Sequence, residues 1–246
     1  MNGTSLSQVL PVFAVVLLSH TVQAMTGFGS TVIALTLGAL FMPIEELRLV
    51  LFALNLPLSL WVVLRHNTLI ERPLLTRRIL PWMGLGLAFG LLVATQLRGV
   101  WLKRAFGVLV ISFALRELWL LWRRRERPPT DPRATSLWLL AAGVVHGIYA
   151  SGGPLVVTAL GGVKLERSAF RATLMALWFT LSVALLVSAL AQHQWTHSMT
   201  VDSLLLLPCL PMGAALGEWL HHRVPDAGFR GLVQTVLVAA GTALLL

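Results

Sequence analysis

The chain has few charged residues and a single cysteine. Charged residues make up 12% of its 246 residues, against about 25% in a soluble domain, and this excludes an ordinary soluble protein. The one cysteine, Cys209, excludes a disulfide within the chain and a metal site built from cysteines. The front of the first apolar segment lacks Lys and Arg, which a cleaved signal peptide normally carries. We therefore expect residues 5–24 to be retained as the first helix.

Apolar residues dominate what remains. They make up 57% of the chain, and the mean hydropathy is +0.80. A spanning helix needs about 20 apolar residues, so the length allows about eight to ten passes and no separate soluble domain. The net charge of +9 could indicate a nucleic-acid partner. However, the basic residues lie in short loops between apolar runs, as expected for the cytoplasmic side of a membrane protein. The expected partner is the lipid bilayer, with no nucleic acid.

Two parts of the chain repeat one pattern. With a shift of 123 residues, Gly29, Gly38, Arg48 and Ser59 fall on Gly152, Gly161, Arg171 and Ser182. With a shift of 127, Pro81, Gly86 and Gly90 fall on Pro208, Gly213 and Gly217. This predicts a first membrane repeat over 1–122, a basic proline-containing cytoplasmic linker over 123–135 and a second repeat over 136–246. Together the repeats would form one transport domain.

The pattern predicts five helical runs in each repeat. They are 5–24, 29–42, 44–64, 79–97 and 102–122, and then 136–149, 152–163, 166–190, 200–221 and 229–246. The second run of each set is too short to cross a bilayer comfortably. It is expected to be a half-helix or part of a re-entrant hairpin, and whether 5–24 and 29–42 each cross stays open. The predicted fold is an all-α polytopic membrane protein, with a broken or re-entrant short helix pair and three transmembrane helices per repeat.

The basic residues indicate how the repeats are oriented. Five crossings per repeat, or three and a re-entrant hairpin, would invert the second repeat. With the amino terminus outside, fourteen Lys and Arg then fall inside, four fall outside and Arg116 lies within a run, which accounts for all 19. Counting each broken segment as one crossing would give parallel repeats and an even split. The bias favours inverted repeats with both termini outside, hence periplasmic in a bacterial inner membrane.

A glycine-rich break in each repeat carries the candidate site. Glycine, serine and threonine at the start of a half-helix leave backbone N–H groups unpaired, and the positive end of the helix dipole attracts anions. Irregular backbone at membrane depth is tolerated only inside protein or a water-filled cavity. Inverted repeats would bring the two breaks together near the middle of the membrane. The break residues predicted to bind a small anion are Thr26, Gly27, Gly29, Ser30 and Thr31 in the first repeat and Tyr149, Ser151, Gly152 and Gly153 in the second. Glycines that merely let helices pack closely are the alternative.

Several other polar residues complete the candidate substrate-binding set. Gln23 and His146 hold equivalent places just before the breaks, and polar side chains at that depth are usually functional. His146 could donate to an anion or carry a proton. Arg48 and Arg171 are also equivalents, which either bind the anion or reach the interface. Asn55 is the last candidate, and its repeat equivalent is Trp178. No catalytic residue, metal ligand or cofactor is predicted.

At these residues the chain resembles the sulfite exporter TauE/SafE family, also called the 4-toluene sulfonate uptake permease family. The resemblance rests on Gly27–Thr31, Ser151–Leu155, Pro81–Gly90 and Leu102–Gly107, and it covers nearly the whole chain. It implies a bacterial inner-membrane carrier of small sulfur-containing anions, with protons as the coupling ion. The family's glycine stretch typically has three consecutive glycines, whereas here Gly29 is followed by Ser and Thr, and Gly152 and Gly153 by Pro.

Other functions fit parts of the pattern. An anion channel could use the same helix ends, and a carboxylate carrier the same donors. An intramembrane serine protease is suggested only by the segment Tyr149–Gly152, which lacks the leading glycine of a Gly-x-Ser-Gly motif. No histidine lies at a convincing depth on a late helix, because His221 and His222 fall at the end of a run. We therefore expect a transporter and no enzyme. The sequence does not specify the anion, the direction of transport or the oligomeric state.

Overall fold

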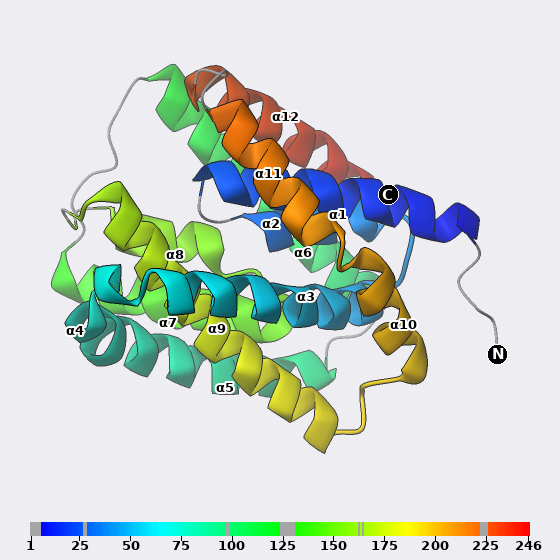
Figure 1. The fold of residues 1–246 in the computed structure, drawn as a ribbon, viewed down its shortest axis with the longest axis horizontal. Helices are drawn as coiled ribbons and strands as arrows, with labels where there is room; N and C mark the ends of the chain where they lie inside the picture. The colour runs from blue at the N-terminus through cyan, green and yellow to red at the C-terminus, as the bar shows by residue number, and fades with distance from the viewer. Residues whose placement is uncertain are drawn as a thin grey trace. The chain divides into compact units, whose positions relative to one another are not determined.

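Every secondary-structure element of the computed structural model is a helix (Figure 1). The structure describes residues 6–26, 29–96, 99–123, 131–161, 163, 165–221 and 226–246, and no strand occurs within these ranges. The predicted all-α class is therefore confirmed. The candidate residue Gly27 and the side chain of the candidate Thr26 lie outside the described part.

The helices follow the predicted runs closely. In the first half they are α1 (Leu6–Thr26), α2 (Ser30–Gly38), α3 (Ile44–Arg65), the 3-10 turn η1 (Asn67–Leu69), α4 (Arg72–Leu74), the π-helical turn η2 (Leu75–Ile79), α5 (Leu80–Gln96) and α6 (Val100–Trp122). In the second half they are α7 (Pro132–Tyr149), α8 (Gly153–Ala159), α9 (Arg167–Ala191), α10 (His197–Leu206), α11 (Cys209–His221) and α12 (Asp226–Ala243). The second helix of each set, α2 or α8, is short, as predicted.

Helix α7 begins earlier than the sequence predicted, at Pro132 rather than at residue 136. The Asp131 carboxylate accepts a hydrogen bond from the N–H of Arg133 at 3.1 Å and so caps the helix. Proline in the first turn has no N–H to leave unpaired. The end of the predicted linker is therefore helical, while residues 124–130 lie outside the described part.

Proline interrupts the same position of both repeats. The run predicted over 200–221 consists of α10 and α11, which are separated at Leu207 and Pro208. Its equivalent Pro81 stands at the start of α5, directly after the π-helical turn η2. Proline has no N–H to donate and clashes with the preceding turn of a helix. Prolines and single π-helical turns are both places where helices kink. The two repeats thus contain the same defect with different local geometry.

Five helical stretches in the described residues are long and apolar enough to cross a membrane. They are Ile44–Arg65, Arg72–Ala94, Val100–Trp122, Ser168–Ala191 and His197–Gly217. Large apolar side chains are also exposed, such as Leu64, Leu92 and Trp122 at 72%, 68% and 77%. A soluble monomer rarely exposes so much apolar surface, whereas lipid accommodates it. The chain is a multi-pass membrane protein.

The chain forms two compact units that mix segments of both repeats. Unit 1 comprises Met1–Arg48, Leu97–Arg127 and Leu204–Leu246, and unit 2 comprises Leu49–Gln96 and Pro128–Ser203. These units are defined by contacts in space and do not test the repeat boundaries, which stay a prediction. What the structure adds is that each compact unit takes helices from both repeats.

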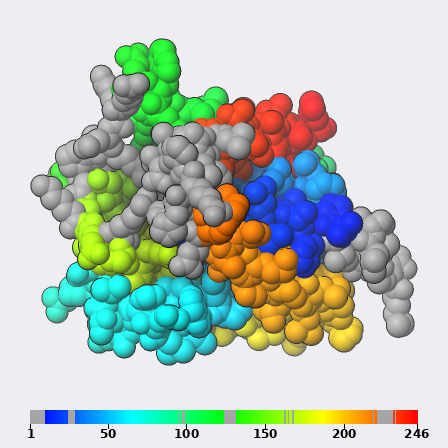
Figure 2. All heavy atoms as spheres, turned by 45° about the horizontal axis from the view of Figure 1, so that its top comes forward, coloured from blue at the N-terminus to red at the C-terminus, as the bar shows by residue number. Residues whose placement is uncertain are grey.

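In unit 1, α11 packs along α1, as Figures 1 and 2 show. A Cβ on Gly213 would lie 2.8 Å from Cβ of His20, and one on Gly217 would lie 2.5 Å from the Thr21 carbonyl oxygen. Gly213 meets His20, and the later Gly217 meets the later residue Thr21, so the two helices run parallel. Small residues spaced four apart allow this close approach in membrane helices. Helices α6 and α12 also pack together in this unit.

In unit 2, α5 packs along α7 in the equivalent way. A Cβ on Gly86 would meet the Leu140 carbonyl oxygen, and one on Gly90 the Val144 carbonyl oxygen. Because α1 is equivalent to α7, and α11 to α5, the predicted pairing of Gly86 with Gly213 and of Gly90 with Gly217 has a matching packing role.

Helices α3 and α9 of unit 2 run antiparallel. Asn55, within α3, bonds to Ser182 of α9, whereas the N–H of Glu71, beyond the end of α3, bonds to Thr173 near the start of α9. These helices are repeat equivalents, so their opposite directions support the inverted orientation. That orientation stays a prediction.

Candidate functional site

The break in unit 1 is held by backbone conformation. Helix α1 ends at Thr26, and α2 begins at Ser30 behind Gly29, which has φ +93°. This left-handed conformation is the one that glycine adopts without strain. The Gly29 carbonyl accepts the first bond of α2 from Ile33 at 3.1 Å. A Cβ at Gly29 would meet nothing within 4 Å, so conformation rather than space requires glycine here.

The break in unit 2 is held by close packing. Helix α7 ends at Tyr149 and is capped by Ala150, whose φ is +55° and whose N–H bonds to the His146 carbonyl at 2.7 Å. Gly152 has an ordinary φ of −79°, but a Cβ there would collide with the carbonyl oxygen of Ala142. The start of α8 therefore packs back onto α7 at a distance that only glycine permits.

His146 lies at the centre of this break. Its side chain is 3% exposed, and its ring stacks on the Trp178 ring with 5.4 Å between the centroids. The N–H of Gly152 donates to Nδ1 of His146 at 3.4 Å. The other ring nitrogen, Nε2, is buried and has no hydrogen-bond partner among the described residues.

Ser151 is the second buried polar group at the break without a partner. It is 3% exposed, and its hydroxyl oxygen forms no hydrogen bond within the part of the chain that the structure describes. Tyr149, on the preceding turn, is buried as well. Buried polar groups are nearly always hydrogen-bonded. His146 and Ser151 are two exceptions, five residues apart on either side of the end of α7. They therefore indicate a place where a polar ligand or water binds.

One face of α9 connects this break to Asn55. Trp178 and Ser182 are one helical turn apart and share a face. Trp178 stacks on His146, and Ser182 accepts a hydrogen bond from the side-chain amide of Asn55 at 3.2 Å. We call His146, Ser151, Trp178, Ser182 and Asn55 the polar cluster of unit 2. All five residues are buried.

The candidates at the break of the first repeat lie in unit 1. Gln23 is buried on α1 and Ser30 is buried at the start of α2, whereas Thr31 is half-buried. The expectation that both breaks line one pocket stays a prediction, as does the binding role of each residue.

The two candidate arginines differ in their surroundings. Arg48 is half-buried in the second turn of α3, whereas Arg171 is exposed in the second turn of α9. An exposed arginine near a helix start is the arrangement expected for a side chain that reaches the interface. Of the pair, Arg48 is the better candidate for a role inside the protein.

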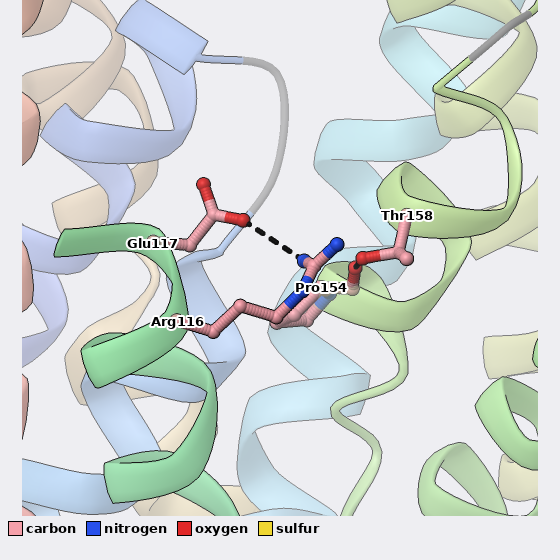
Figure 3. Close-up of polar contacts among 4 residues, drawn as sticks. All are labelled: Arg116, Glu117, Pro154 and Thr158. Carbon is pink, nitrogen blue, oxygen red and sulfur yellow. Dashed lines mark hydrogen bonds and ion pairs between the residues drawn. The ribbon is translucent and has the colours of Figure 1, made fainter. Parts of the chain in front are cut away.

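Two further polar contacts of the chain lie within single helices. In Figure 3 the hydroxyl of Thr158 donates to the Pro154 carbonyl at 2.9 Å, one turn earlier in α8. The same figure shows Arg116 paired with its neighbour Glu117 on α6 at 3.3 Å. No group of three His, Cys, Asp or Glu side chains able to hold a metal occurs among the described residues.

A comparison with known families accounts for this architecture. The family model described as "Sulfite exporter TauE/SafE" matches residues 12–244. The chain belongs to the sulfite exporter TauE/SafE family. TauE/SafE proteins are membrane exporters of sulfite and related sulfur anions and not enzymes, which confirms the predicted class. No curated protein and no solved structure matches the chain.

Sequence reasoning missed two members of the polar cluster as site residues in this TauE/SafE protein. Trp178 is the repeat equivalent of Asn55, and Ser182 is the equivalent of Ser59. That equivalence marked their positions, but only the fold brings Trp178 onto His146 and Ser182 onto Asn55. The sequence did contain one indication: Trp178 and Ser182 are one helical turn apart, so they lie on the same face of α9.

Proposed function

We propose that this TauE/SafE protein is an alternating-access carrier for a small sulfur-containing anion, such as sulfite or an organosulfonate. The proposal includes coupling to protons and a location in a bacterial inner membrane with both termini periplasmic. The family supports the substrate class, and the excess of basic residues in the predicted inner loops supports the orientation.

The observation that carries the proposal is the pair of unsatisfied polar groups at the break of unit 2. The Nε2 nitrogen of His146 and the hydroxyl of Ser151 are buried without a partner among the residues described. Leaving a buried polar group unsatisfied costs about 1–3 kcal/mol. A bound anion would accept hydrogen bonds from both and remove that cost.

The remaining candidates extend this site. The N–H groups at Gly152 and Gly153 begin α8, and Tyr149 lies on the preceding turn. Asn55 is linked to the other residues of the polar cluster by its hydrogen bond to Ser182. By repeat equivalence, Gln23 and the stretch from Thr26 to Thr31 would supply similar donors at the break of the first repeat. Arg48 and Arg171 would attract the anion toward the protein.

The first test is transport by the purified protein in liposomes. Sulfite, thiosulfate, sulfoacetate, taurine and a carboxylate are offered with and without a pH gradient. Saturable uptake of a sulfur-containing anion that responds to the gradient is the expected result. Preference for the carboxylate would make it a carboxylate carrier, and flux that neither saturates nor responds to the gradient would make it a channel.

The second test addresses the site. Replacing Gly153 with Val should abolish transport, because a branched side chain would occupy the buried start of α8. Replacing the exposed Gly161, just beyond α8, with Ala is the matched control and should leave transport unchanged. Both variants should insert into the membrane normally. Full transport by the Gly153 variant would refute the site assignment.

A further inference from the structure

The two ring nitrogens of His146 have different partners. Nδ1 receives the N–H of Gly152 at 3.4 Å. A backbone N–H can only donate, so Nδ1 must be the unprotonated nitrogen of the ring. A neutral ring then carries its proton on Nε2, the buried atom without a partner in the described part of the chain.

The surroundings of the ring also favour its neutral form. Helix α7 packs on α5 and α8, and Trp178 of α9 stacks on the ring. None of these four helices contains an Asp or a Glu. Burying a charge is costly unless a counter-charge is near. An imidazolium at this position would have no acidic partner on the helices around it, and it would lose the bond from Gly152.

The other buried histidine near a repeat break shows the opposite arrangement. Nδ1 of His20 on α1 lies 2.9 Å from the Val16 carbonyl oxygen. A carbonyl only accepts, so Nδ1 of His20 carries the proton, and its donor is satisfied within the helix. Of these two histidines, only His146, at the break, has a donor nitrogen without a partner among the described residues.

The repeat equivalent of His146 is Gln23, which is buried on α1. The terminal amide of glutamine presents N–H donors at the Nε2 position, and it does not take up a proton near neutral pH. Both residues can donate a hydrogen bond from the end of the side chain. Only His146 could carry a proton.

We propose that His146 binds the transported anion as a neutral ring, through Nε2–H, and that the coupling proton is carried elsewhere. This inference rests on the proposed function and narrows it. The site would recognise an anion oxygen by neutral donors, His146 Nε2–H and the Ser151 hydroxyl. It would not recognise the anion by a positive charge on His146.

Two substitutions separate this role from the alternatives. In His146→Gln the side chain keeps a donor at the Nε2 position and loses the Nδ1 acceptor. In His146→Asn the amide oxygen can replace Nδ1 as the acceptor for Gly152, and the far donor is lost. The half-saturation concentration, the maximal rate and the pH profile of uptake are measured in liposomes for both variants and the wild type. Size-exclusion chromatography establishes that each variant is folded.

We expect the Gln variant to keep the half-saturation concentration within about threefold and the pH profile unchanged. The Asn variant should raise the half-saturation concentration about tenfold or more, as expected for a lost donor to a charged acceptor. A difference ¹⁵N spectrum of wild type and the Gln variant in liposomes should show a neutral ring protonated at Nε2 between pH 6 and 8.

Each other outcome overturns the inference. An active Asn variant with an inactive Gln variant would mean that His146 only holds the Gly152 break. Loss of gradient-driven uptake in both variants, with exchange of anion retained, would make His146 the proton carrier. A wild type that moves no anion of the panel would instead refute the proposed function, which is a separate result.

Discussion

The two units share one arrangement, in which a long helix is followed by a glycine break and a short helix and packs along a third helix. These helices are α1, α2 and α11 in unit 1 and α7, α8 and α5 in unit 2. Different residues stabilise the arrangement in each unit. In unit 1 the break depends on the left-handed Gly29, and the glycines of the helix contact lie on α11 alone, facing His20 and Thr21. In unit 2 the break depends on the close approach of Gly152 to Ala142, and both contacting helices contribute glycines.

The difference indicates that the helix packing of unit 2 can adjust less than that of unit 1. Contacts between backbones cannot shift as easily as contacts with side chains, and interiors packed in this way transmit any misfit. The polar cluster with the unsatisfied donors also lies in unit 2. A binding site gains from such rigid support, because its donors must be held in place before the ligand arrives.

The largest effect is expected at the helix contact of unit 2. Gly86→Ala places a Cβ against the Leu140 carbonyl oxygen and the Gly143 backbone. It should lower stability by about 1–3 kcal/mol, as overpacking does. Gly213→Ala in unit 1 should cost less, because its nearest contact is Cβ of His20 at 2.8 Å. Thermal unfolding in detergent measures both.

The control for this pair is on the same helix. A Cβ at Gly84 of α5 meets nothing within 4 Å, and alanine favours a helix over glycine by about 1 kcal/mol. Gly84→Ala should therefore be neutral or slightly stabilising. Equal losses at Gly84 and Gly86 would contradict the close-packing explanation.

The next effect separates the two breaks. Gly152→Ala should disturb the hairpin of α7 and α8 and reduce transport strongly, because Ala142 blocks the added atom. Gly29→Ala should cost only the left-handed conformation, about 1–2 kcal/mol. Gly29→Asn should cost less, since asparagine tolerates that conformation, whereas Gly152→Asn should be no better than Gly152→Ala. Transport and thermal stability are compared for all four. A rescue of position 152 by asparagine would show that its requirement is conformational after all.

A smaller effect is expected where α3 meets α9. Asn55→Ala and Ser182→Ala each remove one side of the 3.2 Å bond. Their coupling energy in a double-mutant cycle should be about 0.6 kcal/mol, typical of polar pairs between membrane helices. If Asn55 also binds the anion, its variant should weaken anion binding more than the Ser182 variant does. Identical transport by both single variants would limit Asn55 to helix packing.

The smallest effect is expected at the exposed arginine. Arg171→Gln should change the half-saturation concentration by no more than about twofold, because exposed substitutions rarely exceed 0.5 kcal/mol. Arg48→Gln, at the equivalent but half-buried position, should have the larger effect. Uptake assays of the two variants, at low and high salt, test the order. Equal and large losses of uptake in the two variants would indicate that both arginines bind the anion.

The sequence predicted the helices and their short second members well, because apolar runs and glycine breaks are local signals. It also paired Gly86 with Gly213 and Gly90 with Gly217, and these have matching roles. It did not predict that α1 would pack on α11 and α5 on α7, since nothing local indicates that each unit takes helices from both repeats. For the same reason Trp178 and Ser182 were missed: their importance comes from partners on other helices. The start of α7 was misplaced because Asp131 and Pro132 were read as linker residues.

The composition of unit 1 has a consequence for how the protein is made. Helix α1 leaves the ribosome before its partner α11, because helices α2 to α10 lie between them in the chain. During most of synthesis the side of α1 that will accept Gly213 and Gly217 must remain against lipid or a temporary partner. A chain stopped after the first repeat would hold α1, α2 and α6 without α11 and α12. Assembly of this unit therefore waits until α11 and α12 enter the bilayer.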